Sequence, residues 1–467
     1  MAQTGHSAAG HGRSRKSIHG QWTSRWAFIL AAAGSAVGLG NIWRFPYITG
    51  EYGGGAFVLV YLICVVLVGI PIMMAEVLLG RRGRQSPINT MRTLGAEEGG
   101  TEHWQYLGWM GVVAGFLILS FYSVVGGWTL AYIMRAASGM FTGATATDTE
   151  AMFVSLVGDA ERLLAWHTIF MVMTVVVVAR GVQHGLEKAV RFLMPALLLL
   201  LLVMVGYAMS TSGFIPAVEY LFKPDFSKLS ADAILAALGQ AFFSMSLGMG
   251  AIMIYGSYLP AKASIPKTVF YIAAMDITVA IMAGLAIFPL VFSFGLEPGQ
   301  GTGLIFQTLP IAFGQMPYGG LFATLFFVLL MFAAWTSSIS LLEPAVAWLA
   351  ENRGIKRINA SILTGIVAWV MGVGSLLSFN HWSGNTLFGK TFFDLVEYLT
   401  TNIMLPLGGL LTAVFAAWIM SRHASAEELG GDTFGYMIWR VTTRYIAPLG
   451  VLLVFMEATG IINLSRL

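Results

Sequence analysis

The chain of 467 residues has very few charged residues and a single cysteine. Asp, Glu, Lys and Arg together make up only 10% of it, whereas apolar residues make up 57%. A soluble globular domain carries about 25% charged residues, so this composition excludes that class and indicates a membrane protein. Cys64 alone forms neither an internal disulfide bond nor a metal site built from several cysteines.

Motifs that would indicate other functions are also missing. No glycine-rich phosphate loop followed by Lys and Ser or Thr is present, so nothing indicates ATP as an energy source. The net charge of only +3 gives no sign of nucleic-acid binding. The histidines, His103 and His167 among them, show neither metal-ligand spacing nor pairing with a nucleophile, so we expect no enzyme activity. No feature indicates an obligatory protein partner.

Long apolar runs fill most of the chain, and each is near or above the ~20 residues that a helix needs to cross a bilayer. They number eleven and lie at residues 26–50, 55–79, 105–136, 163–181, 186–210, 232–257, 266–294, 318–350, 358–379, 392–420 and 435–463. A stretch near 303–316 is predicted to be a short helix in an external loop. The first 20 residues are polar and basic without an apolar core, which predicts a cytoplasmic tail rather than a cleaved signal peptide.

Lys and Arg residues predict the orientation in the membrane. Most of them fall in the N-terminal tail and in the loops after spans 2, 4, 6, 8 and 10, whereas the opposite loops hold few, such as Lys223 and Lys390. By the positive-inside rule the N-terminus is then cytoplasmic, and after an odd number of spans the C-terminus is external.

Two of the spans are interrupted by glycine near their middle. Residues 33–41 read AGSAVGLGN, and residues 244–250 read SMSLGMG. Glycine lets the backbone leave the helix, and the freed carbonyl and amide groups at membrane depth need protein or a bound solute to satisfy them. A pair of interrupted spans in the two halves of a chain is the sequence pointer to the central site of a transporter.

Oxygen-bearing residues near these breaks indicate a cation site. Ala333, Thr336 and Ser337 have helical spacing, so a carbonyl and two hydroxyls would share one face, and the carbonyls of Gly34 and Val37 can reach the same point. Uncharged hard oxygens suit a monovalent alkali cation. The alternative is that the hydroxyls bond to their own helix or join two helices.

Asp276 stands alone in an apolar stretch of the seventh predicted span. An acidic side chain at mid-helix costs roughly 2.5–3.5 kcal/mol in a membrane and therefore needs a partner. A bound cation would be such a partner. The alternative is a protonated Asp276 that makes a structural hydrogen bond.

The sequence resembles the neurotransmitter:sodium symporter family, in particular its prokaryotic amino-acid transporters. The resemblance covers nearly the whole chain. Besides the two interrupted segments, the matching strings are WTSR at 22–25, RFP at 44–46, EYGGGAF at 51–57, QAFF at 240–243, YGSY at 255–258 and TSSI at 336–339. The resemblance implies an all-α polytopic membrane protein with the leucine-transporter fold, which is a 5+5 inverted repeat, here with one extra helix and with spans 1 and 6 unwound. It also implies the cytoplasmic (inner) membrane of a prokaryote.

In that fold the chain would divide into five parts. They are a cytoplasmic N-terminal tail (1–24), a first repeat of spans 1–5 (25–210), an external loop (211–231), a second repeat of spans 6–10 (232–420), and span 11 with an external C-terminus (421–467).

The resemblance also implies roles for individual residues. A first sodium site would use Ala36, Asn41, Ser244 and Asp276, and a second would use Gly34, Val37, Ala333, Thr336 and Ser337. The substrate would contact Ala36, Leu39, Gly40, Ile118, Tyr122, Val125, Phe243, Ser244, Ser246, Met249, Ser337 and Leu341. Family members that need chloride carry a neutral residue at the position of Asp276, so we expect this chain to be chloride-independent.

The substrate class follows from Gly38. The monoamine branch of the family has an aspartate at this position. Because this chain has glycine there, the resemblance implies a substrate that carries its own carboxylate, which indicates an α-amino acid. The predicted side-chain contacts are apolar, and a charged side chain among them would be desolvated without a partner. We therefore expect a neutral aliphatic or aromatic side chain.

Gates and hinges complete the prediction for alternating access. The outer gate would be Arg44 and Glu397, assisted by Asp394, and the inner gate would be His19, Trp22, Tyr258 and Glu351. His19 replaces the usual arginine, so the inner ion pair is expected to be weaker or pH-sensitive, or Lys16 takes its place. Gly185 and Pro195 would allow the start of span 5 to unwind, and Glu76 would hold free amides of span 6.

Together these expectations describe a symporter that imports neutral hydrophobic or aromatic α-amino acids with two sodium ions. Two other functions stay open at this point. One is a proton-coupled permease of the same fold, and the other is an amino-acid sensor that does not transport.

Overall fold

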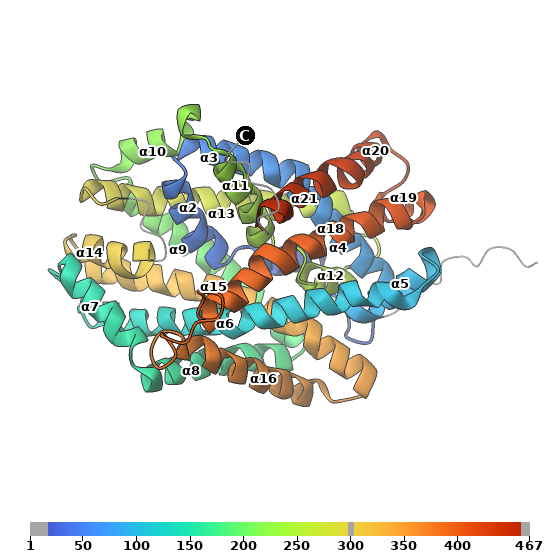
Figure 1. Ribbon diagram of the computed structural model, residues 1–467, viewed down its shortest axis with the longest axis horizontal. Coiled ribbons are helices and arrows are strands. Elements are labelled where there is room, and N and C mark those ends of the chain that lie inside the picture. The colour runs from blue at the N-terminus through green and yellow to red at the C-terminus, as the bar shows by residue number, and fades with distance from the viewer. Residues whose placement is uncertain (1–16, 298–302, 459–467) are drawn as a thin grey trace, which may run out of the picture.

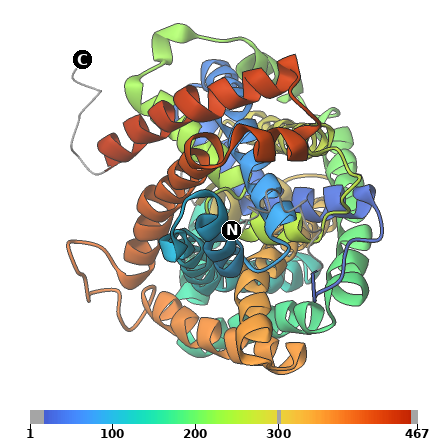
Figure 2. The same cartoon turned by 90° about the vertical axis from the view of Figure 1, so that its right-hand side faces the viewer.

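The computed structural model describes residues 17–297 and 303–458. Within these ranges the regular structure is helical, apart from one isolated bridge between Leu387 and Lys390. Most long helices run side by side along the longest axis of the molecule (Figure 1). Figure 2 looks along this bundle from the end that carries α5 (Pro87–Glu98) and α19 (Arg422–Leu429), which we call the inner end because the positive-inside rule predicts it to be cytoplasmic.

By length and composition, eight helices of the described residues are able to cross a membrane. They are α3–α4 (Gly55–Gly83), η3–α6 (Glu102–Ala137), α8 (Ala160–Ala179), η4–α9 (Val182–Ala208), α13 (Ile265–Ser293), α15 (Gly319–Arg353), α16 (Arg357–Leu377) and α17–η8 (Phe392–Ile419). A ninth consists of α1 (Arg25–Ala36) and the segment of η1 and α2 (Gly40–Glu51), which meet at an angle of 51°. The protein is therefore a multi-pass membrane protein.

Two of the eleven predicted spans do not meet the same criteria. The segment 232–257 divides into α11 (Ala231–Ser244) and α12 (Ala251–Ser257), which are both too short to span alone. The last one contains α20 (Phe434–Val441), η9 (Thr442–Ile446) and α21 (Ala447–Ala458), and its predicted end at 463 lies outside the described residues. The count of eleven, like the division into five parts, stays a prediction.

Both predicted helix breaks are present. α1 ends at Ala36, Val37 has an extended backbone, and the chain resumes as the π-helical turn η1 (Gly40–Arg44). The second break, between α11 and α12, places Ser246, Gly248 and Gly250 at positive φ of 55°, 80° and 73°. Glycine adopts that conformation easily, whereas it is uncommon for serine, so the glycines explain why this helix ends here.

The two longest helices, α6 (Gln105–Ala137) and α15, pack against each other through the centre of the bundle. α1 packs on α13 and α15, while α11 packs on α3 (Gly55–Cys64) and α12 on α4 (Ile70–Gly83). The two breaks are thereby brought to the same level, beside the middle of α6 and α15.

Short helices join the long ones. The predicted helix near 303–316 is present as η6 (Leu304–Thr308) and α14 (Leu309–Gly314). Four others were not predicted, because a search for long apolar runs does not detect short helices of mixed composition: α5, α7 (Ala146–Val157), α10 (Phe214–Phe222) and α19.

Candidate functional site

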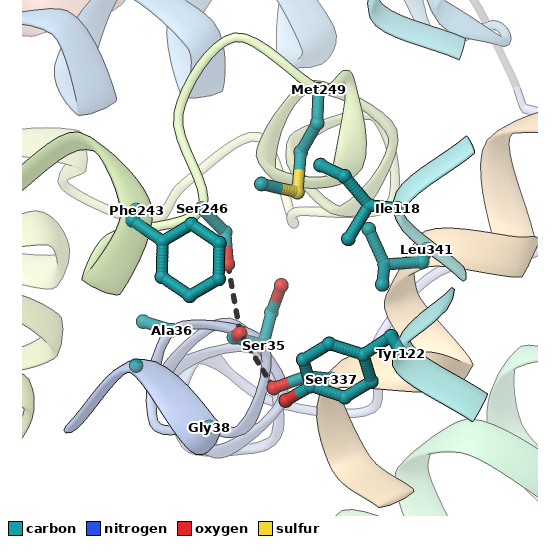
Figure 3. A pocket seen from close by; sticks show the side chains of 11 residues that line it. Ser35, Ala36, Gly38, Ile118, Tyr122, Phe243, Ser246, Met249, Ser337 and Leu341 are labelled. Atoms are coloured by element: carbon teal, nitrogen blue, oxygen red, sulfur yellow. Dashed lines mark hydrogen bonds between the residues drawn. The ribbon is translucent and has the colours of Figure 1, made fainter. Parts of the chain in front are cut away.

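A small cavity lies between the two breaks (Figure 3). Its volume is about 20 Å³, which is room for about one water molecule. Its lining consists of Ser35, Ala36, Gly38, Gly40, Ile118, Tyr122, Phe243, Ser246, Met249, Ser337 and Leu341. All predicted substrate contacts except Leu39, Val125 and Ser244 therefore line this cavity, and Ser35 is an additional lining residue that the sequence did not single out.

One side of the cavity is polar because the breaks free backbone groups. The Ser35 carbonyl accepts hydrogen bonds from the Ser246 hydroxyl at 2.8 Å and from the Ser337 hydroxyl at 3.1 Å (Figure 3). The Leu39 amide donates to the Tyr122 hydroxyl at 3.1 Å. Hydroxyls from the second break, α15 and α6 thus satisfy main-chain groups of the first break, as membrane depth requires.

The other side of the cavity is apolar. Ile118, Met249 and Leu341 lie together there, opposite Ser35 and Ser337 (Figure 3). All three are buried, and no charged side chain is among the lining residues described above. The cavity therefore offers backbone polar groups to one part of a ligand and an apolar surface to another part.

Only glycine fits at position 38, because two side-chain hydroxyls lie close to its backbone. A Cβ atom added to it would lie 2.5 Å from the Ser337 hydroxyl oxygen and 2.8 Å from that of Tyr122. Even alanine would therefore displace the two hydroxyls that line the polar side of the cavity.

Asp276 lies fully buried in a cage of hydrogen-bond donors beside the first break. One carboxylate oxygen accepts from the Asn41 amide at 2.7 Å, and the other accepts from the hydroxyls of Tyr61 at 3.1 Å and Ser244 at 3.2 Å. α13, η1, α3 and α11 each contribute one residue. Tyr61 was missed by the sequence analysis, since the only signal is that a buried tyrosine hydroxyl needs a partner.

The predicted second cation site lies where α15 meets α1. A Cβ atom on Gly34 would lie 3.4 Å from the Thr336 Cβ, so backbone and side chain are in close contact. The Ser337 hydroxyl lies 3.4 Å from the Gly34 carbonyl oxygen. The Thr336 hydroxyl donates to the carbonyls of Phe332 and Ala333, both at 3.1 Å, which leaves its oxygen lone pairs available. Val37 is buried at the end of α1.

A second cavity of about 60 Å³ lies on the other side of Tyr122 and Phe243, which line both cavities. Its remaining lining residues are Leu39, Trp43, Arg44, Tyr47, Phe121, Val125, Phe393 and Glu397. Leu39 and Val125, predicted as substrate contacts, thus face this outer cavity.

Arg44 and Glu397 line the outer cavity, but no ion pair joins them within the described part of the chain. The Arg44 guanidinium instead lies 5.0 Å from the centre of the Phe243 ring and donates to the Gln240 side chain at 3.4 Å. Asp394 accepts from the Thr391 hydroxyl at 2.7 Å in a capping box at the start of α17.

At the inner end, the structure joins His19 to Glu351, with 2.9 Å between the His19 Nε2 and a carboxylate oxygen. The same carboxylate accepts from the Ser86 amide and from the Asn89 side chain, both at 2.7 Å. Trp22 is buried and its indole donates to the Tyr255 carbonyl at 3.1 Å. Lys16, the predicted substitute, lies outside the described residues.

A buried ion pair lies next to this inner contact. Glu343 of α15 is fully buried, pairs with Arg357 at the start of α16, and accepts from the Tyr258 hydroxyl at 2.7 Å. Tyr258 thus belongs to this pair rather than to Glu351. Glu343 and Arg357 were not predicted, although Glu343 is an acidic residue in an apolar span, which is the signal that singled out Asp276.

The predicted hinge of span 5 begins in a π-helical turn. Gly185 lies in η4 (Val182–Glu187), and Pro195 lies inside α9 (Lys188–Ala208). Glu187, which was not predicted, is buried, accepts from the Thr23 amide at 3.0 Å and pairs with Arg191 at 2.7 Å. The segment that leads into α1 is thereby attached to η4, which leads into α9.

Glu76 of α4 (Ile70–Gly83) lies fully buried beside the second break. One carboxylate oxygen accepts from the Gly248 amide at 2.6 Å. Gly248 is in the segment between α11 and α12, so this carboxylate satisfies an amide that the break has freed, which is the contact that the resemblance implies.

Comparisons with known proteins agree with this geometry. The model of the sodium:neurotransmitter symporter family matches residues 19–150 and 154–466. A Bacillus subtilis protein described as the uncharacterized sodium-dependent transporter YhdH is 42% identical over 395 residues, which cover 85% of this chain and 87% of that one. A sodium-dependent transporter of Haemophilus influenzae, also described as uncharacterized, is 35% identical over 86% of this chain and 90% of its own.

Among solved structures, the crystal structure of MhsT in complex with L-phenylalanine matches with a TM-score of 0.87 and 40% identity. The match covers 94% of this chain and 99% of that one, and it establishes the leucine-transporter fold. The two breaks, the cavity between them and these matches agree, and this chain belongs to the sodium:neurotransmitter symporter family.

Proposed function

We propose that this protein imports neutral hydrophobic or aromatic α-amino acids together with sodium ions by alternating access. The observation that carries the proposal is the cavity between the two breaks, with main-chain polar groups on one side and apolar side chains on the other. An α-amino acid has the matching division into a zwitterionic head and a side chain. The complex of MhsT with L-phenylalanine supports this substrate class, because that protein shares 40% of its sequence with this chain.

In this proposal the substrate carboxylate binds the amides of Leu39 and Gly40 and the hydroxyl of Tyr122. Freed amides at a helix start carry partial positive charge and favour an anion. The ammonium group faces carbonyls near Phe243 and Ser246. Because the cavity now has room for about one water molecule, binding has to separate the two breaks. The hydrogen bond between Ser246 and the Ser35 carbonyl is the contact that has to open.

The apolar subsite sets the side-chain preference. Ile118, Met249 and Leu341 provide an apolar surface, and Met249 is unbranched and adapts to different shapes. We propose that this subsite accepts aromatic and larger aliphatic side chains. A charged side chain would lose its hydration there without gaining a partner.

We propose two sodium ions. The first binds at the cage of Asp276, Asn41 and Ser244 with the Ala36 carbonyl, and the second binds between the carbonyls of Gly34, Val37 and Ala333 and the hydroxyls of Thr336 and Ser337. A single carboxylate among neutral oxygens suits a monovalent cation. Asp276 supplies one negative charge inside the protein, so transport needs no chloride.

Two sodium ions with a zwitterion move two charges, worth about 4.6 kcal/mol at 100 mV. That energy corresponds to roughly three decades of substrate accumulation before the sodium concentration gradient is counted. The outer gate in this proposal consists of Arg44 and Glu397 above Phe243 and Tyr122, and the inner gate of His19, Glu351, Trp22 and Tyr258. The start of α9, with Gly185 and Pro195, unwinds to admit water to the second sodium ion.

The test is uptake of radiolabelled phenylalanine, tryptophan and leucine into proteoliposomes of the purified protein. We expect saturable uptake with an inward sodium gradient, none when potassium replaces sodium at fixed pH, and no change when gluconate replaces chloride. Uptake in potassium would instead favour a proton-coupled permease. Sodium-dependent binding without uptake would favour a sensor.

A further inference from the structure

One arginine of the last helical segment, Arg444, lies beside exposed aromatic rings on the outside of the bundle, and no carboxylate among the described side chains pairs with it. Arg444 belongs to the π-helical turn η9, ten residues into the predicted span 435–463. Its guanidinium carbon lies 4.2 Å from the centre of the Trp418 ring and 5.6 Å from that of Tyr445. Trp418 and Tyr445 are 49% and 54% exposed, so the aromatic neighbours of this cation lie on the outer surface of the bundle.

The local backbone holds this arrangement in place. Pro448 has no N–H group and therefore does not bond the Arg444 carbonyl in the helical i+4 pattern. The Trp418 indole donates to that carbonyl at 2.9 Å instead. Trp418 itself lies in the π-helical turn η8 (Phe415–Ile419) of the neighbouring helix. The aromatic ring is thus fixed over the guanidinium by a backbone group that the proline leaves free.

The charge of Arg444 has no counter-charge in the described residues. No Asp or Glu side chain that the structure describes lies within ion-pair distance, and no described group accepts a hydrogen bond from its guanidinium, whose Nε is enclosed without a partner. The segments 1–16, 298–302 and 459–467 contain no Asp or Glu. Glu457 stands thirteen residues further along the same helix, about 20 Å away along its axis.

Two other arginines of the inner end have hydrogen-bond partners that Arg444 lacks among the described residues. Arg422 is exposed and pairs with both carboxylate oxygens of Asp432, at 2.8 and 2.9 Å. Arg440, one turn before Arg444, donates to the hydroxyls of Ser425 at 3.1 Å and Tyr436 at 2.8 Å, and it also has no carboxylate partner among the described residues. Near the inner end of the bundle, Arg440 and Arg444 are thus two positive charges four residues apart, neither paired with a carboxylate among the described side chains.

We propose that Arg444, Trp418 and Tyr445 bind the phosphate group of an anionic phospholipid in the inner leaflet. A charged group at membrane depth needs a counter-charge, and the guanidinium presents several N–H donors in a planar fork that matches phosphate oxygens. Tryptophan and tyrosine are enriched in membrane proteins at the level of the lipid headgroups. The second positive charge on Arg440 favours a lipid with net negative charge over a zwitterionic one.

The experiment measures lipid bound to the full-length protein, which is purified in neutral detergent and stripped of lipid. Palmitoyl-oleoyl phosphatidylglycerol or phosphatidylcholine is added, and native mass spectrometry counts the adducts. We expect at least a threefold preference for phosphatidylglycerol in the wild type. R444Q should abolish that preference, whereas the matched control R422Q, which removes the same charge from an arginine with its own carboxylate, should keep it.

R444K and W418L test the same site in case the R444Q protein does not fold. Lysine keeps the charge but not the planar fork, and W418L removes the stacking ring, so we expect a reduced but measurable preference in both. Three results would overturn the proposal. They are an unchanged preference in R444Q and W418L, inorganic phosphate that competes as well as phosphatidylglycerol, and lipid-free protein whose Arg444 surface is covered by a second copy in a dimer that R444Q dissociates.

Discussion

Replacing Asp276 with asparagine tests whether the buried carboxylate balances a sodium ion. The substituted side chain has the same shape but no charge. Tyr61 and Ser244 donate to one carboxylate oxygen of Asp276, and in the Asp276→Asn protein that position holds either an NH₂ group or a neutral oxygen. Two opposite unit charges about 4 Å apart attract by about 4 kcal/mol at an effective dielectric constant near 20, which is roughly a thousandfold in affinity. The amide still offers an oxygen ligand, so we expect sodium affinity to fall by at least about 100-fold.

The assay is the sodium concentration needed for half-maximal binding of radiolabelled phenylalanine in gluconate and in chloride buffers. We expect the wild type to respond equally in both, and the Asp276→Asn protein to need far more sodium in gluconate. Chloride should restore part of the affinity, because the hydroxyls of Tyr61 and Ser244 are then free to donate to an anion. Tyr61→Phe is the matched control: it removes one hydrogen bond to a charged group, worth about 1.5–3 kcal/mol, but keeps the charge, so it should create no chloride dependence. Full chloride-free activity of Asp276→Asn would refute the reasoning.

The other predictions use the same binding and uptake assays. Gly38→Ala should weaken substrate binding by about 10-fold to 100-fold, because overpacking costs about 1–3 kcal/mol and the added Cβ lies 2.5 Å from the Ser337 oxygen; normal affinity would contradict the assigned cavity. His19→Ala should favour the inward-open state by about fivefold, since a part-buried hydrogen bond to Glu351 is lost, and His19→Arg should reverse this shift; labelling of a cysteine introduced below the cavity measures both. Glu187→Gln, compared with Arg191→Gln, should speed substrate release to the inside, because the attachment of Thr23 to η4 loses its charge; equal release rates would contradict a hinge at this point.

Much of the fold could be predicted from the sequence because its signals are local. A bilayer requires long apolar runs, and the glycines within 33–41 and 244–250 allow the backbone to leave the helix, so both breaks were predicted at the right residues. Asp276 was singled out because an acidic side chain is costly in such a run. The same cost applies to Glu343, whose partner Arg357 pairs with it from the next helix.

What could not be predicted depends on contacts between distant segments. Tyr61 looks like an ordinary aromatic residue of span 2, and only the packing of α3 beside α13 brings its hydroxyl to Asp276. Glu187 lies at the start of the fifth predicted span, 186–210, and nothing in its neighbourhood indicates Thr23, 164 residues earlier. The relation between Arg44 and Glu397 depends on the conformation of the outer cavity, which a sequence does not specify.

Hydrogen bonds at the inner end hold the segment that leads into α1. At the inner end, His19 bonds Glu351, Trp22 bonds the Tyr255 carbonyl, and Thr23 bonds Glu187, so the segment that leads into α1 is attached to α15, α12 and η4. Such bonds contribute about 0.5–3 kcal/mol each, so together they oppose inward opening by an amount on the order of 4 kcal/mol, or about three decades in population.

The same short helix carries the site. Gly34 and the Ser35 carbonyl belong to α1, so a movement that breaks the inner contacts also moves the oxygens that face α15 and the second break. A ligand shifts an equilibrium only by its difference in affinity for the two states. Ions and substrate that hold α1 against α15 and the second break therefore stabilise the inward-closed state. In the proposed transport cycle, inward release requires the loss of these site contacts and of the inner hydrogen bonds in one movement, because α1 and the residues that lead into it form one continuous segment.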